Sequence, residues 1–300
     1  MKATELSPRC SWAIGDVFRE AGLPDGVLNV IAHKPSDAAV VTKALIEHPS
    51  VKKVNFTGST MVGRIIAKLA GENLKPILLE LGGKAPAIVW EDADLKLAAH
   101  ECALGAFLHS GQICMSTERI IVHKNVASKF EEEMKTAIKQ IFPEAGVLIN
   151  KMGVEKNQRL LKDALGKGAT LVNGSLETQE SSETRMSPIV VKDITTEMEL
   201  YHTESFGPTV SMFAIETEEE ALRLANDTEY GLSSAIFTED LRRGLRMAKQ
   251  IEAGAVHINA MTVHDEPALP HGGVKNSGYG RFGNVGLDEW VKTKTVTFRN

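Results

Sequence analysis

The chain has 300 residues, 43% of them hydrophobic, and a formal net charge of −5 at pH 7. This content supports a large core, and the length predicts two domains. No Lys/Arg run is interleaved with aromatic residues, which argues against a nucleic-acid surface, and no stretch of about 18 apolar residues predicts a membrane span.

The first residues and the cysteines indicate the cellular compartment. Residues 1–5 do not lead into an apolar signal core, and three cysteines cannot all pair in a disulfide framework. We therefore expect a cytoplasmic protein with reduced thiols. The chain also starts directly in a helical pattern, so we expect further sequence upstream.

The first third of the chain alternates between helical and extended patterns, which is typical of α/β proteins. Apolar spacing predicts helices at residues 11–21, 36–47 and 62–70, and strands at residues 27–31 and 51–56.

The alternation continues with predicted strands at residues 77–81, 85–90 and 119–123, and helices at 95–108, 127–141, 217–226 and 241–251. Residues 168–174 and 178–185 are rich in Gly, Ser, Thr and Glu, so they are expected in surface loops. Alternating polar and apolar residues predict a strand at 291–298.

A glycine turn, GSTMVG at residues 58–63, lies between a predicted strand and a predicted helix. Free backbone N–H groups and the positive end of a helix suit a phosphate there. The pattern is neither the usual dinucleotide fingerprint nor a P-loop, so an ordinary strand-to-helix turn is the alternative.

Two further residues are candidates for chemistry. Glu80 ends an apolar strand, where burial would suit it to general-base work; the alternative is a solvated acid paired with Lys84. Cys114 follows a helix and a Gly-Gln turn, where nearby N–H groups are expected to favour the thiolate; the alternative is an inert buried thiol. Cys102, inside an apolar helix, is expected to be structural, and Cys10 receives no role.

Six motifs resemble those of the aldehyde dehydrogenase superfamily and occur in the same order. They are FTGST at 56–60, LELGGK at 79–84, GQIC at 111–114, ESFGP at 204–208, EYGLS at 229–233 and NSGYGR at 276–281. The run VHDEPALPHGG at residues 263–273 is most similar to the branch with salicylaldehyde and vanillin dehydrogenases, which favours aromatic aldehydes.

The resemblance implies roles for the two candidates. Cys114 would attack an aldehyde carbonyl, hydride would pass to a nicotinamide, and Glu80 would activate the water that hydrolyses the thioester. The backbone N–H of Cys114 is a candidate donor to the oxyanion. Transfer of the acyl group to coenzyme A is disfavoured by Glu80, because acylating relatives generally lack a water-activating acid there.

Cofactor contacts are implied in the same way, and no metal site is predicted. Gly58, Ser59 and Gly63 would lie near the pyrophosphate, and Glu204 and Phe206 near the nicotinamide; a solvated loop acid is the alternative for Glu204. Lys2 and Glu5 would hold the adenosine ribose, and a carboxylate at Glu5 would favour NAD over NADP. A solvated terminal Lys and Glu are the alternative.

The resemblance also predicts the domain organisation. A partial Rossmann-like cofactor domain is expected at residues 1–83, an α/β catalytic domain at 84–288, and a C-terminal oligomerisation strand at 289–300 that pairs subunits of a homodimer or homotetramer. Roughly the first third of a family member, with the Asn that completes its oxyanion hole, is expected to be absent. An inactive paralogue that retains the catalytic residues is therefore the alternative.

Overall fold

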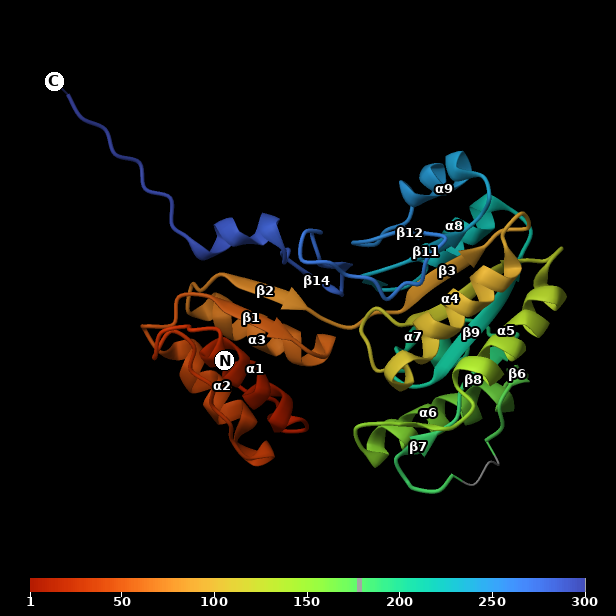
Figure 1. Ribbon diagram of the computed structural model, residues 1–300, viewed down its shortest axis with the longest axis horizontal. Helices are drawn as coiled ribbons and strands as arrows, with labels where there is room; N and C mark the ends of the chain where they lie inside the picture. Colours follow the sequence, from red (N-terminus) through yellow and green to blue (C-terminus); the bar gives the residue numbers. More distant parts are fainter. Residues whose placement is uncertain (177–179, 300) are drawn as a thin grey trace. The chain divides into compact units, whose positions relative to one another are not determined.

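The computed structural model describes residues 1–176 and 180–299. These residues form two compact units (Figure 1). Unit 1 comprises Met1–Val54 and Ile65–Ile77, and unit 2 comprises Asn55–Arg64 and the described part of Leu78–Asn300. Among the described residues, no helix is long and apolar enough to cross a membrane.

Unit 1 is mainly helical. It contains α1 (Pro8–Glu20), the short η1 (Pro35–Asp37), α2 (Ala38–Glu47) and most of α3 (Thr60–Glu72), which confirms the three helices predicted in this region. α1 begins earlier than predicted, at Pro8, because the fixed φ of proline suits the first turn of a helix.

The predicted strand at residues 27–31 is wrong. Ile31 alone forms an isolated parallel bridge with Lys2, and no regular ladder follows. A strand needs a neighbour of similar length, and here the paired partner is the short segment of residues 1–3.

The core of unit 2 is a seven-stranded sheet of order β12-β11-β3-β4-β9-β8-β6. All neighbouring strands in it are parallel except β6 and β8. Every residue of β3 and β4 is buried, as expected for central parallel strands covered on both faces. The strands are β3 (Ala85–Val89), β4 (Thr117–His123), β6 (Thr170–Asn173), β8 (Ile189–Lys192), β9 (Thr209–Ile215), β11 (Ala235–Phe237) and β12 (His257–Ile258).

Helices cover both faces of this sheet, as Figure 1 shows. α4 (Leu95–Phe107) and α5 (Ala127–Ile141) pack on the face that carries Ala87 and Val89. α6 (Lys151–Gly166), the short α7 (Glu199–His202), α8 (Glu218–Asn226) and α9 (Leu241–Ala248) pack on the face that carries Ile88. The result is a three-layer arrangement that confirms the predicted α/β class.

Two regions of unit 2 differ from the predictions. Residues 168–174 are not a loop, because Thr170–Asn173 forms β6 at the sheet edge; pairing on one side only leaves it partly exposed and explains its weak apolar pattern. Of the loop predicted at 178–185, residues 178 and 179 lie outside the described residues, and Arg185–Met186 forms β7, paired with β5 (Gly146–Val147).

The last described residues follow η3 (Asn284–Trp290). Residues 291–299 are exposed and have no regular secondary structure, so the strand predicted at 291–298 is not formed within the single chain. A strand exists only when it pairs with another, and pairing with a second subunit stays a prediction.

Candidate active site

Glu80 is the last residue of β2 (Ile77–Glu80) and is only 3% exposed. β14 (Gly278–Tyr279) pairs antiparallel with this end of β2 and places Gly278 opposite Glu80. Gly278 has φ +113°, and a Cβ there would lie 2.0 Å from the Leu79 carbonyl oxygen, so glycine is required for this close pairing.

The environment of the Glu80 carboxylate excludes the alternative of a solvated acid paired with Lys84. The ionisable side chain beside it is His271, whose Nε2 lies 3.2 Å from Glu80 Oε2, at hydrogen-bond distance but outside good hydrogen-bond angles. Lys84 instead pairs with Glu118.

Two glycines after β2 let separate backbone segments meet. A Cβ on Gly83 would lie 2.1 Å from the carbonyl oxygen of Cys114, and one on Gly82 would lie 3.0 Å from a carboxylate oxygen of Glu204. The Gly83 N–H donates to Glu204 at 2.8 Å, and the Ser277 hydroxyl donates to the Gly82 carbonyl at 2.6 Å. The Gly82-Gly83 turn therefore brings the Cys114 backbone and the Glu204 carboxylate to the end of the strand that carries Glu80.

Cys114 is partly exposed and lies in a turn after η2 (Leu108–Gly111). His109 and Ser110 there have φ of 49° and 59°, which turns the chain sharply out of α4. The Gln112 side chain fixes this turn: its amide donates to the carbonyls of His109 and Val147, and its oxygen accepts from the Ile149 N–H. Cys114 is therefore not the fully buried inert thiol of the alternative interpretation.

The other two cysteines lie elsewhere in the fold. Cys102 is 1% exposed within the core beneath α4, which confirms its structural interpretation. Cys10 is exposed on α1 in unit 1.

The electrostatic environment of Cys114 corrects one prediction. Burial, and then the charges of Glu80 and Glu204, raise the pKa of Cys114 to about 11. The backbone N–H groups of Cys114 and Met115 lower that pKa, as expected of them, but these effects are smaller than burial and the two carboxylates. The thiol rather than the thiolate is thus favoured in the isolated chain.

A buried ion pair organises the segment that carries Glu204. The Lys84 ammonium lies 2.8 Å from the Glu118 carboxylate and also donates to the Thr203 carbonyl at 2.8 Å. Glu118 accepts from the backbone N–H and hydroxyl of Ser205 and from the N–H of Phe206. Burial lowers the pKa of Lys84, and the Glu118 carboxylate opposes that effect.

Glu204 is not the solvated loop acid of the alternative interpretation. It is held by the Gly83 N–H, and burial, with the neighbouring charge of Glu118, raises its pKa to about 7. Its neighbour Phe206 is 40% exposed and has φ 49°, so the ring is presented to solvent by a strained backbone.

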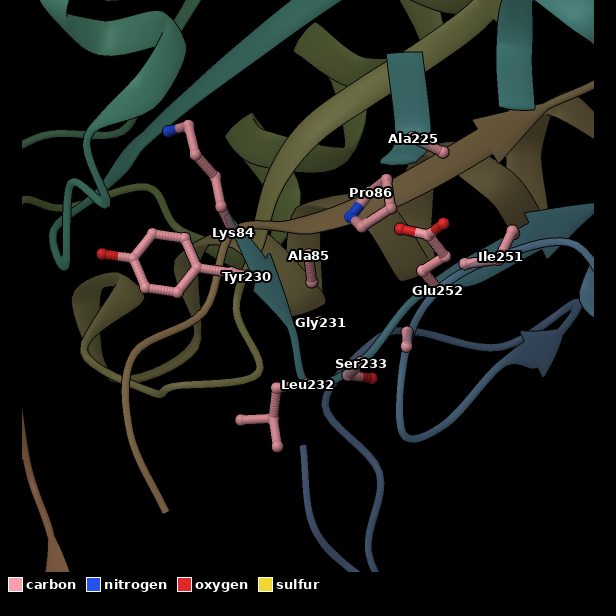
Figure 2. A pocket seen from close by; sticks show the side chains of 11 residues that line it. Lys84, Ala85, Pro86, Ala225, Tyr230, Gly231, Leu232, Ser233, Ile251 and Glu252 are labelled. Atoms are coloured by element: carbon pink, nitrogen blue, oxygen red, sulfur yellow. The ribbon is translucent and has the colours of Figure 1, made fainter. Parts of the chain in front are cut away.

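A small pocket extends beside this segment (Figure 2). Figure 2 shows the Lys84 side chain and the Tyr230 ring on one side of the pocket, with the Lys84 ammonium directed away from the carboxylate of Glu252. Burial, followed by the charge of Glu204, raises the pKa of Tyr230 to about 12, so its hydroxyl stays protonated near neutral pH.

The glycine turn at residues 58–63 also lies in unit 2 and connects to Glu80. The Gly58 N–H donates to the Glu80 carbonyl at 3.0 Å, and the Ser59 hydroxyl accepts from the Val62 N–H at 3.4 Å at the start of α3. A Cβ on Gly63 would lie 2.5 Å from a methyl carbon of Leu81, so α3 starts close against the strand end.

Lys2 and Glu5 belong to unit 1 and contact each other there. Their side chains form an ion pair at 3.0 Å, and His33 Nε2 lies 3.0 Å from the same Glu5 oxygen. The backbone and the Lys2 ammonium lower the pKa of Glu5 by hydrogen bonding, so its carboxylate is ionised at neutral pH. These two residues are partnered, unlike the freely solvated pair of the alternative interpretation.

The sequence interpretation gave no role to three residues that shape the site: Glu118, Ser277 and His271. Glu118 lies just before the strand predicted at 119–123 and within the observed β4, and in sequence it resembles a solvent-facing acid. Its buried charge is paired with Lys84, which is distant in sequence. Ser277 and His271 lie in two of the motifs that resemble the family. Their place in those motifs was the one feature of the sequence that could have indicated a role in the site.

The model of the aldehyde dehydrogenase family matches residues 1–296. The chain belongs to the aldehyde dehydrogenase family. A vanillin dehydrogenase of Pseudomonas fluorescens is 45% identical over 309 residues, which cover 100% of this chain and 63% of that protein. A salicylaldehyde dehydrogenase of Pseudomonas putida is 41% identical over 307 residues, covering 99% of this chain and 62% of the relative.

Solved structures of the family have the same fold. A salicylaldehyde dehydrogenase from Pseudomonas putida G7, complexed with salicylaldehyde, has a TM-score of 0.91 and 40% identity, covering 96% of this chain and 61% of that chain. A betaine aldehyde dehydrogenase from Staphylococcus aureus, in complex with NAD+, has a TM-score of 0.89 and 32% identity, covering 98% and 62%. The chain thus spans slightly less than two thirds of the length of these family members.

The Lys84–Glu118 pair should be required for folding stability. Lys84→Met leaves the Glu118 charge buried without its partner, so the free energy of unfolding measured in urea should fall by about 3–5 kcal/mol. Lys124→Met is the control, since it breaks the exposed ion pair with Glu216 and should change stability little. A Lys84→Met protein as stable as the wild type would contradict this role.

The acidic environment of Cys114 should be measurable by thiol alkylation. Glu204→Gln removes one of the charges that raise the Cys114 pKa, so iodoacetamide should modify this thiol severalfold faster at pH 8 to 9. Peptide mass spectrometry separates Cys114 from the exposed Cys10, and the exposed acid Glu239, changed to Gln, is the control. Equal rates in the Glu204 and Glu239 variants would show that Glu204 does not act on the thiol.

Proposed function

We propose that this protein oxidises an aldehyde, of the aromatic class, to a carboxylic acid with NAD. The observation that supports it is the meeting of Cys114, Glu204 and the strand end with Glu80 at one glycine turn, in a member of the aldehyde dehydrogenase family. The names of the vanillin and salicylaldehyde dehydrogenases among its relatives support aromatic substrates.

Cys114 is the proposed nucleophile. Its sulfur adds to the aldehyde carbonyl carbon to form a thiohemiacetal, and loss of hydride from that carbon and of the hydroxyl proton leaves a thioester. Because the pKa of Cys114 is about 11, the thiol must lose its proton during or before attack. The Cys114 backbone N–H is the proposed donor to the oxyanion.

Glu80 is the proposed base for the second half of the reaction. It removes a proton from water, the oxygen adds to the thioester carbonyl, and the C–S bond breaks to release the acid and the thiolate. Its burial supports this role, because both carboxylate oxygens lack a well-aligned hydrogen bond within the described residues and can accept one from water.

NAD is the proposed cofactor, and when bound it supplies the hydride acceptor. In unit 2, Gly58, Ser59 and Gly63 at the start of α3 are the proposed contacts to the pyrophosphate, since the positive end of a helix dipole attracts an anion. The N–H groups of Gly58 and Gly63 are themselves bonded within the chain, so these glycines would contribute close approach of the backbone. The exposed Phe206 ring and Glu204 are the proposed nicotinamide contacts. NAD bound to the Staphylococcus aureus relative supports the same cofactor here.

In unit 1, Lys2 and Glu5 are the proposed contacts to the adenosine ribose. The low pKa of Glu5 keeps a carboxylate available for ribose hydroxyls, and the same charge repels a 2′-phosphate. This supports NAD over NADP. The proposed domains remain residues 1–83 for the cofactor, 84–288 for catalysis and 289–300 for oligomerisation, in a cytoplasmic enzyme.

Aldehyde oxidation should be observed directly as NADH formation at 340 nm with vanillin, salicylaldehyde or benzaldehyde. Cys114→Ala should abolish NADH formation, because no thiohemiacetal can form. Glu80→Gln should release one equivalent of NADH rapidly and then slow by roughly 100-fold or more, because thioester hydrolysis loses its base. The structural Cys102→Ala variant is the control. No NADH with any aldehyde, or equal rates in wild type and Cys114→Ala, would refute the proposal.

Subunit association is proposed through residues 289–300. Val291, Val296 and Phe298 are more than 60% exposed, as expected of a strand that pairs in a dimer or tetramer. Light scattering should show a dimer or tetramer for the wild type and a smaller mass for the Val296→Asp, Phe298→Asp double variant. Lys294→Asp, in the same segment, controls for the added charge. A wild-type monomer at micromolar concentration would refute this proposal.

A further inference from the structure

Glu80 needs a route for the proton that it takes from water. Its side chain is 4% exposed, so direct exchange with bulk solvent is restricted. Hydrolysis of the thioester brings in two protons with the water. The released Cys114 thiolate, with its raised pKa, takes up one of them, and the other must leave the site because the carboxylic acid product ionises at neutral pH. The following inference rests on the proposed role of Glu80.

His271 connects this carboxylate to the surface. Its Nε2 lies 3.2 Å from Glu80 Oε2, and its Nδ1 lies 3.8 Å from Asp265 Oδ1. Side-chain exposure rises along the three residues, from 4% at Glu80 to 18% at His271 and 49% at Asp265. The two ring nitrogens of one imidazole therefore face a buried acid on one side and a solvated acid on the other.

The backbone holds His271 in this position. The His271 N–H and carbonyl form an antiparallel bridge with Phe282, at 3.3 and 2.7 Å. Phe282 follows β14, the strand that pairs with the Glu80 end of β2. The histidine and the carboxylate are thus fixed through one connected set of backbone hydrogen bonds.

We propose that His271 is a positioning residue that carries the proton from Glu80 to solvent. The protonated Glu80 carboxyl gives its proton to Nε2 of the neutral imidazole, and the proton on Nδ1 leaves to Asp265 or water. The imidazole then returns to its starting tautomer by exchange with solvent. One proton enters, one leaves, and Glu80 is again a carboxylate.

The charges around the ring support this direction of transfer. Glu80 from β2 and Asp265 from the preceding loop face the imidazole, as does Arg281 from the segment after β14. The Glu80 carboxylate, 3.2 Å from Nε2, is the main cause that raises the pKa of His271; burial and Arg281 oppose it. When Glu80 carries the proton its own charge no longer acts on the ring, and the remaining charge of Asp265 favours arrival of the proton on the imidazole.

An activated ester tests the relay without any cofactor. p-Nitrophenyl acetate would acylate Cys114 directly, so the burst of nitrophenolate measures acylation and the steady state measures thioester hydrolysis. His271→Phe and His271→Gln should keep the burst amplitude and hydrolyse the acyl-enzyme roughly 10-fold or more slowly. Gln can hydrogen-bond to Glu80 but cannot relay a proton. His264→Phe, a histidine of the same loop, is the control.

The pH profile and chemical rescue separate a relay from a merely structural contact. Wild-type hydrolysis should fall as pH drops through the raised pKa of His271, because a protonated imidazole cannot accept another proton, and the variants should lack this limb. Added imidazole should restore hydrolysis in His271→Ala. Histidine ring NMR should show that Glu80→Gln lowers the pKa of His271.

The outcomes distinguish this inference from the proposed function. Absence of a Cys114-dependent burst in the wild type would overturn both. A normal burst, with hydrolysis in His271→Gln as fast as in the wild type, would overturn the relay alone. An unchanged His271 titration in Glu80→Gln would also overturn it, because the two side chains would then not interact.

Discussion

The buried pair of Lys84 and Glu118 is the interaction on which the site depends. It joins the residue before β3, the second residue of β4 and the segment that follows α7. Removing two charges from water has a large desolvation cost, so such a pair is stable only when further hydrogen bonds satisfy the remaining donors and acceptors. Here the Lys84 ammonium also donates to the Thr203 carbonyl. The Glu118 carboxylate accepts from the N–H and hydroxyl of Ser205 and from the N–H of Phe206.

This pair determines where the next acid lies. Because Ser205 and Phe206 are bound to Glu118, their neighbour Glu204 is directed to the Gly83 N–H. The Gly82-Gly83 turn in turn lets the Cys114 backbone approach closely. The site is therefore assembled by backbone contacts that side chains at residues 82 and 83 would prevent.

The sequence predicted the central elements well and the edges poorly. The apolar residues at 85–89 and 120–122 lie in the buried β3 and β4, so predicting strands at 85–90 and 119–123 needed no long-range information. β6 was missed because an edge strand buries one side only, and residues 27–31 were wrongly predicted because apolar content does not supply a partner strand.

For Cys114 and Glu80, the chemistry of the residues alone left both the functional and the structural interpretation open, and the order of the motifs made the catalytic roles expected. Two features depend on the folded chain and could not be predicted from spacing in the sequence. They are the carboxylates of Glu80 and Glu204, which raise the pKa of Cys114, and the proximity of His271 to Glu80.

The environment of Cys114 also has a consequence for chemical durability. Peroxides and electrophiles attack the thiolate, and a thiol with a pKa of about 11 has very little of it at neutral pH. The same burial and acidic neighbours that raise the pKa of this thiol therefore protect it from oxidation. Cys114 is therefore expected to be weakly reactive toward oxidants at neutral pH, even though its side chain is partly exposed to solvent.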